Sequence, residues 1–178
     1  TTDKAGGNYA ALIRTVGWGK DNSAHATQDY AIATCSNVTS GELYLGTYNA
    51  TTTSPDYGYN FDSRPIRLEF HYKYVPKNPD DYFITTITVK DKNKNIITEK
   101  VIEGTAQSTY NIMRIDLDYQ NNYRTKAGNI CISFKSTGNP SCLAANSSNL
   151  TGPPARNTSN GEYIGSQLYI DDIELIYE

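Results

Sequence analysis

The amino-acid sequence predicts an all-β fold made of two packed antiparallel sheets, and three observations lead to this prediction. Thr (20 residues) and Tyr (15) are abundant and favour strands, while Asn (17) and Ser (13) favour turns. Apolar and polar residues alternate with a period of two over long stretches. Leu, Glu and Ala, which favour helices, never build a long run. A length of 178 residues fits one domain, so residues 1–178 are expected to form a single β-sandwich.

The clearest strand begins at Ile66. Apolar and polar side chains alternate there in the order Ile66, Arg67, Leu68, Glu69, Phe70, His71, Tyr72, Lys73 and Tyr74. One face of this strand is expected to be buried, and the charged side chains of the other face to pair across strands in solvent. The same pattern predicts strands at residues 10–16, 30–35, 41–48, 82–90, 96–103, 111–119, 129–135 and 167–177, with a hairpin turn at residues 91–95. The first and last strands are expected to lie close in space.

Charge and hydropathy exclude several classes of partner. A net charge of −3 provides no field that would hold the chain on phosphates, so nucleic acid is not expected to bind. No apolar run approaches the ~20 residues of a membrane-spanning helix, and no signal peptide is recognisable at Thr1. Membrane attachment is expected only through a lipid anchor outside this chain. The abundance of Tyr, Thr and Asn favours an extracytoplasmic location.

The cysteines do not form a complete disulfide framework, because Cys35, Cys131 and Cys142 are an odd number. Cys131 and Cys142 either bridge a loop or remain thiols, and Cys35 is expected to be a buried thiol. The cysteines and the two histidines, His25 and His71, lack the short spacing of a zinc site.

Two long loops, residues 49–64 and 137–165, interrupt the strand pattern, and loops of this length often carry binding sites. Inside the first loop Tyr57, Tyr59 and Phe61 would lie on one side of an extended segment. Aromatic rings stack on the apolar face of a pyranose, so this loop is a candidate carbohydrate site. Tyr57 is expected to be the most exposed of the three; in the alternative interpretation Phe61, and with it Tyr59, anchors the loop in the core.

Four further residues complete the candidate carbohydrate site. Asp56 and Asp62 would accept hydrogen bonds from sugar hydroxyls. Arg64 either donates hydrogen bonds to a pair of hydroxyls or braces the loop. Trp18, which stands between two glycines, either forms a second wall for the sugar or packs beneath a loop.

Two adjacent carboxylates, Asp171 and Asp172, stand in the last expected strand. Calcium takes oxygen ligands, and a structural Ca²⁺ is expected here, with Asp21 or Asp3 from the N-terminal region as a further ligand. The alternative is that an aspartate caps a bulge or accepts hydrogen bonds from a neighbouring loop.

No catalytic residue is expected. Glycoside hydrolysis needs two carboxylates facing each other across a cleft. The carboxylates considered are too scattered in the sequence to nominate a pair, namely Asp56, Asp62, Glu69, Asp171 and Asp172.

Three segments together resemble one family, the PCMD family (a carbohydrate metabolism domain) of Bacteroidetes surface lipoproteins. They are residues 13–22 (IRTVGWGKDN), residues 63–65 (SRP) leading into 71–74 (HYKY), and residues 165–177 (GSQLYIDDIELIY). The segment 58–61 (GYNF) departs from the Gly-x-Pro-Phe pattern of that family. The resemblance implies a jelly-roll sandwich similar to carbohydrate-binding modules. It also implies a C-terminal module of an exported lipoprotein at the outer membrane of a gut bacterium.

The sequence and the resemblance together predict a noncatalytic module that binds glycan weakly at a bacterial surface. The alternative from another class is a structural or protein-interaction domain, a spacer in a surface complex, which exposed apolar patches or a long unpaired edge strand would favour. A small glycoside hydrolase is the weaker alternative, and clustered carboxylates in a pocket would favour it.

Overall fold

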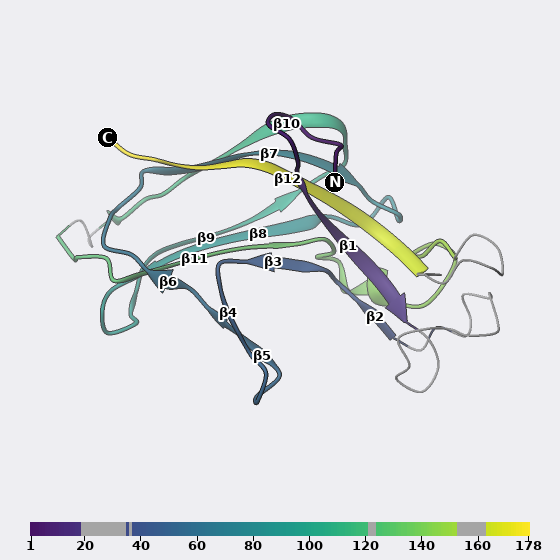
Figure 1. Ribbon diagram of the computed structural model, residues 1–178, viewed down its shortest axis with the longest axis horizontal. Coiled ribbons are helices and arrows are strands. Elements are labelled where there is room, and N and C mark those ends of the chain that lie inside the picture. Colours follow the sequence, from purple (N-terminus) through teal and green to yellow (C-terminus); the bar gives the residue numbers. More distant parts are fainter. Residues whose placement is uncertain (19–34, 36, 121–123, 153–162) are drawn as a thin grey trace.

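The computed structural model describes residues 1–18, 35, 37–120, 124–152 and 163–178, and the structural statements below concern these residues. Their strands form two antiparallel sheets that lie face to face (Figure 1). The described part contains no α-helix and one short 3₁₀ turn, Pro140–Leu143 (η4), so it holds no helix that is long and apolar enough to span a membrane. The predicted all-β jelly-roll sandwich is confirmed.

The first sheet has the strand order β10-β7-β12-β1-β2. Its strands are Gln107–Asp116 (β10), Arg67–Val75 (β7), Tyr163–Ile176 (β12), Ala11–Trp18 (β1) and Asn37–Thr39 (β2). Ala11 of β1 lies opposite Ile170 of β12, so the first and last strands are neighbours, as the sequence predicts.

The second sheet has the order β3-β11-β8-β9. Its strands are Glu42–Tyr44 (β3), Asn129–Lys135 (β11), Phe83–Lys90 (β8) and Ile96–Gly104 (β9), and the short strand Tyr59–Asn60 (β6) also pairs with β11. Gly46–Asn49 (β4) and Ser54–Tyr57 (β5) form a separate hairpin that projects from the sandwich (Figure 1).

The core lies between the two sheets, and the alternating pattern of β7 builds its centre. The buried side chains of β7 are Leu68, Phe70, Tyr72 and Tyr74. Across the interface, the ring of Phe70 meets the ring of Phe134 edge to face, with 5.0 Å between centroids. Phe83 of β8 packs against Tyr72 and Tyr74, with centroids 5.0 and 5.3 Å apart. Aromatic contacts between β7 and the second sheet therefore hold the two sheets together.

A buried carboxylate joins the sheets at the end of the sandwich where β8 begins. Asp81 is 5% exposed and accepts hydrogen bonds from the hydroxyls of Thr137 (2.8 Å) and Ser166 (2.6 Å). The backbone N–H of Tyr82 donates to the same carboxylate at 2.9 Å. Thr137 follows β11 of the second sheet, and Ser166 belongs to β12 of the first. Asp81 is therefore part of a buried polar bridge between the sheets, to which Thr15 of β1 adds hydrogen bonds with Ser136 and Thr137.

Several strand boundaries differ from the sequence prediction. Ile66 is exposed and precedes β7; its backbone N–H donates to the carbonyl of Ile176. The strand expected at 41–48 divides at Leu45 into β3 and β4, because the chain leaves the sheet there to form the projecting hairpin. The strands β2, β5 and β6 were not expected, and residues 30–34 of another expected strand lie outside the described residues.

The cysteine thiols are free and buried at all three positions, Cys35, Cys131 and Cys142. Burial raises the pKa of each thiol, which disfavours the reactive thiolate. The expectation for Cys35 is confirmed, and no bridge joins Cys131 to Cys142. His25 lies outside the described residues.

Candidate functional site

The segment that carries Tyr57 and Tyr59 is shaped by the glycine between them. Gly58 has φ +107°, a conformation that other residues rarely adopt, and its backbone N–H donates to the carbonyl of Leu45 at 2.8 Å. A Cβ at this position would lie 2.3 Å from Oδ1 of Asn129. Gly58 therefore lets the chain turn from β5 into β6 while lying directly against β11.

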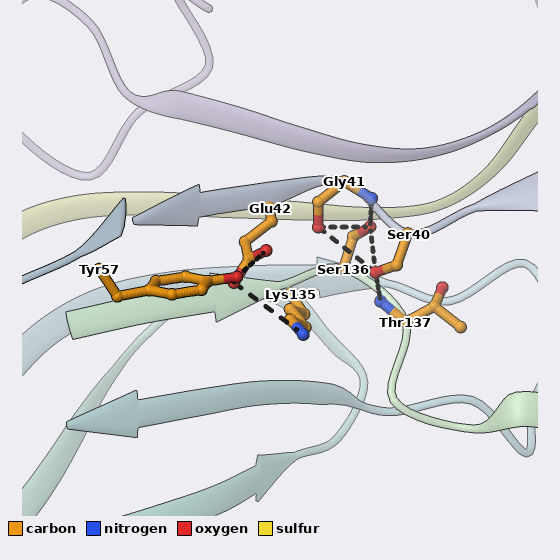
Figure 2. Close-up of polar contacts among 7 residues, drawn as sticks. All are labelled: Ser40, Gly41, Glu42, Tyr57, Lys135, Ser136 and Thr137. Carbon is orange, nitrogen blue, oxygen red and sulfur yellow. Dashed lines mark hydrogen bonds and ion pairs between the residues drawn. The ribbon is translucent and has the colours of Figure 1, made fainter. Parts of the chain in front are cut away.

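Tyr57 is held against the sheet, so it offers less free surface than expected. Figure 2 shows its hydroxyl pointing at the carboxylate of Glu42, to which it donates at 2.9 and 3.1 Å, with Lys135 on the other side of that carboxylate, 4.0 Å away. Its ring meets Tyr44 edge to face. Partial burial and the hydrogen bond to Glu42 raise the pKa of Tyr57 to about 12, so it is a neutral donor at physiological pH.

Tyr59 is the exposed aromatic residue of the segment, with 66% of its surface accessible against 39% for Tyr57. The expectation that Tyr57 is the most exposed was therefore wrong. The alternation that would place Tyr57, Tyr59 and Phe61 on one side is broken at Gly58, and Phe61 packs against the core, as the alternative interpretation held. Tyr59 itself does not anchor the loop.

An open groove of about 630 Å³ runs beside this segment. It is lined by Pro55, Asp56, Tyr57, Gly58, Tyr59, Asn60, Lys90, Asp91, Lys92, Lys94, Gly128 and Asn129. A neighbouring hollow shares Asn60, Lys92 and Gly128 with the groove and adds Phe61, Asp62 and Ala127. The sequence-predicted residues Asp56, Tyr57 and Tyr59 therefore line one groove, and Asp62 lies in the hollow beside it.

Gly128 brings the aromatic segment and the β8–β9 turn together. The backbone N–H of Phe61 donates to the carbonyl of Gly128, and the N–H of Gly128 donates to the carbonyl of Lys90. A Cβ on Gly128 would lie 2.7 Å from the backbone nitrogen of Lys92, so the turn is packed directly on this residue. Segments about thirty residues apart in sequence thus form the two walls of the groove.

The β8–β9 turn is rigidly hydrogen bonded through Asp91. Its carboxylate accepts from the side chain of Asn95 (2.9 Å) and from the backbone N–H groups of Asn95 (2.9 Å) and Asn93 (2.8 Å). These bonds, the side chain of Asn95 first, lower the pKa of Asp91 below its usual range. Asp91 is therefore an ionised structural group, and its turn presents Lys92 and Lys94 to solvent.

Arg64 braces the loop and does not line the groove. Its guanidinium lies over the ring of Tyr119, 4.2 Å from the centroid, and donates to the carbonyl of Thr125 at 3.1 Å. This is the second of the two roles that the sequence left open.

Trp18 is also apart from the groove. It ends β1, where its indole N–H donates to the hydroxyl of Thr39 on β2 at 3.2 Å. Figure 1 shows the end of β1 and strand β6 at opposite ends of the sandwich. Trp18 therefore cannot form a second wall for a ligand that contacts Tyr59.

The polar face of β7 forms ion pairs with the neighbouring strands. Arg67 pairs with Asp116 of β10 and with Glu69, and Arg114 of β10 reaches Glu69 as well. Lys73 pairs with Asp3 of the N-terminal segment. The predicted cross-strand pairing of these charges is confirmed.

Asp171 uses its carboxylate to hold the N-terminal segment. Oδ2 accepts from the backbone N–H groups of Ala5 (2.9 Å) and Gly6 (3.0 Å), and Oδ1 accepts from the N–H of Asp172 (3.0 Å). Although partial burial favours its neutral form, these three N–H groups lower the pKa of Asp171. The carboxylate therefore already has donors where a cation would need free oxygens.

Asp172 has a partner of its own on β7. It occupies a bulge between β12 and β7, with φ +47°, and its carboxylate lies 3.5 Å from Nδ1 of His71. Among the described residues no three His, Cys, Asp or Glu side chains are grouped so that they could hold a metal ion, and Asp21 lies outside those residues. The calcium site stays a prediction, because Asp21 lies outside the described residues, while the contacts of Asp171 and Asp172 match the bulge and hydrogen-bonding alternative.

We expect Asp171→Ala to release the N-terminal segment without unfolding the sandwich, because the two amides that the carboxylate accepts from would lose their partner. The backbone amides of Ala5 and Gly6 should exchange with deuterium faster in the variant. Because the pKa of Asp171 is lowered in the folded protein, acid should also release the N-terminal segment of wild type. The stabilisation that the ionised Asp171 carboxylate provides is present above about pH 4 and is lost as the pH falls through its lower folded-state pKa.

Asp172→Asn is the matched control, since asparagine tolerates its positive φ, and it should leave both amides protected. A chelator should leave the melting temperature of wild type unchanged. A lower melting temperature in EDTA, reversed by added Ca²⁺, would instead support the calcium prediction.

The sequence did not predict that Lys90, Lys92 and Lys94, called the basic wall below, would line the groove. It did not predict Asn129 in the groove either. The available signal was the recurrence of lysine at positions 90, 92 and 94 around the predicted turn. What the sequence does not show is that this turn lies against β6, since that contact depends on Gly128.

No protein-family model matches the chain, and no curated protein sequence matches it either. Among solved structures, it is similar to the carbohydrate-binding module TmCBM61 in complex with β-1,4-galactotriose, at 14% identity and a TM-score of 0.46, over 99% of this chain and 76% of that one. It is also similar to a chain of the infectious bursal disease virus Gx strain, at 9% identity and a TM-score of 0.37, over 91% of this chain and 31% of that one. At these scores neither similarity carries an argument about function.

Proposed function

We propose that this protein is a noncatalytic carbohydrate-binding module and that its site is the groove between the segment Tyr57–Asn60 and the β8–β9 turn. The observation that carries the proposal is the exposed ring of Tyr59 on the wall of an open groove that also presents amide, carboxylate and ammonium groups.

The groove suits one or a few sugar rings for two physical reasons. The face of Tyr59 can cover the C–H side of a pyranose, which is apolar. Asn60 and Asn129 each offer both a donor and an acceptor to the hydroxyls, and the exposed carboxylate of Asp56 offers further acceptors. Since sugar hydroxyls only exchange water for protein partners, we expect a dissociation constant of about 10⁻⁴ M or weaker.

The absence of catalysis is part of the proposal. A glycosidase needs one carboxylic acid that remains protonated near neutral pH. Of the two carboxylates that line the groove, Asp91 has its pKa lowered by the hydrogen bonds of its turn, which is the opposite shift. Asp91 is therefore unsuited to be that protonated acid.

The setting that we propose is a bacterial surface. The resemblance of residues 13–22, 63–74 and 165–177 to the PCMD family supports membership of that family, and with it an extracytoplasmic place in a lipoprotein. Glycans are then the partners that such a module would meet.

The test is a glycan array followed by titration of the best ligand. We expect Tyr59→Ala to weaken binding about tenfold or more, because the stacking face is removed. Its melting temperature should hardly change, because Tyr59 is largely exposed. Tyr48→Ala is the matched control: Tyr48 is similarly exposed, on β4, and does not line the groove. Should no glycan bind, or should Tyr59→Ala bind as wild type does, the proposal is wrong.

A protein-interaction role is the second candidate, and a separate observation favours it. An apolar hollow of about 230 Å³ opens beside the edge strand β3. It is lined by Leu43, Tyr44, Leu45, Ile132, Phe134 and Ile173. Leu45 and Ile173 are exposed there, as at docking surfaces. A glycan panel without any binder would make this spacer or docking role the better interpretation.

A further inference from the structure

We infer that the groove selects anionic saccharides, which carry a carboxylate or a sulfate ester, over neutral ones. This inference rests on the proposed function and names the ligand class of the same site. The lysines of the basic wall carry the argument: Lys90, Lys92 and Lys94 all line the groove.

The three lysines are available to a ligand. Several other basic side chains of the sheets are paired with acids: Arg67 with Asp116, Lys73 with Asp3, and Lys135 with Glu42. No described acidic residue forms an ion pair with a lysine of the basic wall. Their ammonium groups are therefore not neutralised by an ion pair with any residue that the structure describes.

The carboxylates that line the groove itself are fewer than its lysines. Asp91 lines the groove, but three donors of its own turn occupy its carboxylate. Asp56 is then the one further carboxylate on the groove itself, and Asp62 faces the adjoining hollow. Three ammonium groups against two carboxylates leave a positive groove on a chain whose net charge is −3. A local reversal of sign attracts anions to this site.

The arrangement of the two walls also fits a charged sugar. Tyr59 on β6 provides the flat face, and the lysines stand on the wall that Gly128 holds against this segment. A ring stacked on Tyr59 would thus direct a carboxylate or sulfate substituent toward ammonium groups. Lysine ammonium groups are mobile point charges, so they serve either anion.

The experiment compares pairs of saccharides that differ only in charge. Galacturonate oligosaccharides are titrated against galactose oligosaccharides of equal length and linkage, and dextran sulfate against dextran. Wild type is expected to bind at least one charged member about tenfold more tightly than its neutral partner, with the preference falling as salt is added. The first pair tests a carboxylate, and the second a sulfate.

Lys92→Gln/Lys94→Gln should remove the preference, so that the ratio of the two affinities, charged over neutral saccharide, falls to about one. The control is Lys77→Gln/Lys100→Gln, which changes the net charge equally at positions that do not line the groove, and it should keep the preference. An equal loss in the control would mean unspecific attraction of polyanions and would overturn the inference. Neutral binding without any preference would overturn the inference but leave the proposed function intact, whereas no binding of any saccharide would overturn both.

Discussion

Phe83→Ala is expected to lower the free energy of unfolding by about 3–5 kcal/mol and the melting temperature by about 10 °C. Phe83 is completely buried, and its ring in β8 contacts Tyr72 and Tyr74 of β7 in the opposite sheet. Replacing it with alanine would remove these contacts and leave a cavity between the sheets, which the flanking strands cannot close without losing their hydrogen-bonded register.

Urea or thermal denaturation followed by circular dichroism measures this loss. Val101→Ala is the control: Val101 lies on β9, which pairs with β8, but it is 56% exposed. Its substitution should cost less than about 1 kcal/mol. If Phe83→Ala melted within about 2 °C of wild type, the aromatic contacts between the sheets would not be holding the sandwich together.

The parts of the fold that the sequence predicts well are those where one face of a strand is buried along its whole length. The alternation from Leu68 to Tyr74 appears in the structure as alternating burial, because β7 is an inner strand of its sheet, between β10 and β12, with the core on one side only. The pairing of β1 with β12 agrees with the sequence prediction for the same reason.

Strands that depend on a distant partner could not be predicted in this way. β6 contains only Tyr59 and Asn60, and it exists because β11 lies beside it. β4 and β5 are exposed almost throughout, so their side chains show no apolar alternation. Backbone hydrogen bonds between β4 and β5 set their pairing, and the amino-acid composition does not reveal these bonds.

The candidate site was half predictable. The concentration of aromatic residues and carboxylates around Tyr57 pointed to a loop that lines an open groove, but the positions of the side chains within it depend on tertiary contacts. Tyr57 is partly covered because Glu42 of β3 accepts its hydroxyl, and this leaves Tyr59 as the exposed ring. Arg64 and Trp18 were assigned by residue type alone, and both side chains have structural partners elsewhere.

Asp81→Ala is expected to destabilise the protein by about 3 kcal/mol, because two hydroxyls and the backbone N–H groups of Tyr82 and Asn139 would lose their acceptor. Asp81→Asn should cost less. Its remaining oxygen can still accept from Tyr82, and the hydroxyls of Thr137 and Ser166 can turn to accept from the new amide. A comparison of the two variants in urea separates the loss of acceptors from the mere loss of a charge.

This pair of variants also tests whether the groove is independent of the bridge. Asp81 precedes β8, while Lys90, Lys92 and Lys94 stand at the other end of the same strand and in the turn that follows it. Folded Asp81→Asn protein should therefore bind saccharide as wild type does, at a lowered melting temperature. If Asp81→Ala were as stable as wild type, the buried carboxylate would not be a bridge between the sheets. If Asp81→Asn lost binding while folded, the two ends of β8 would be coupled, contrary to this prediction.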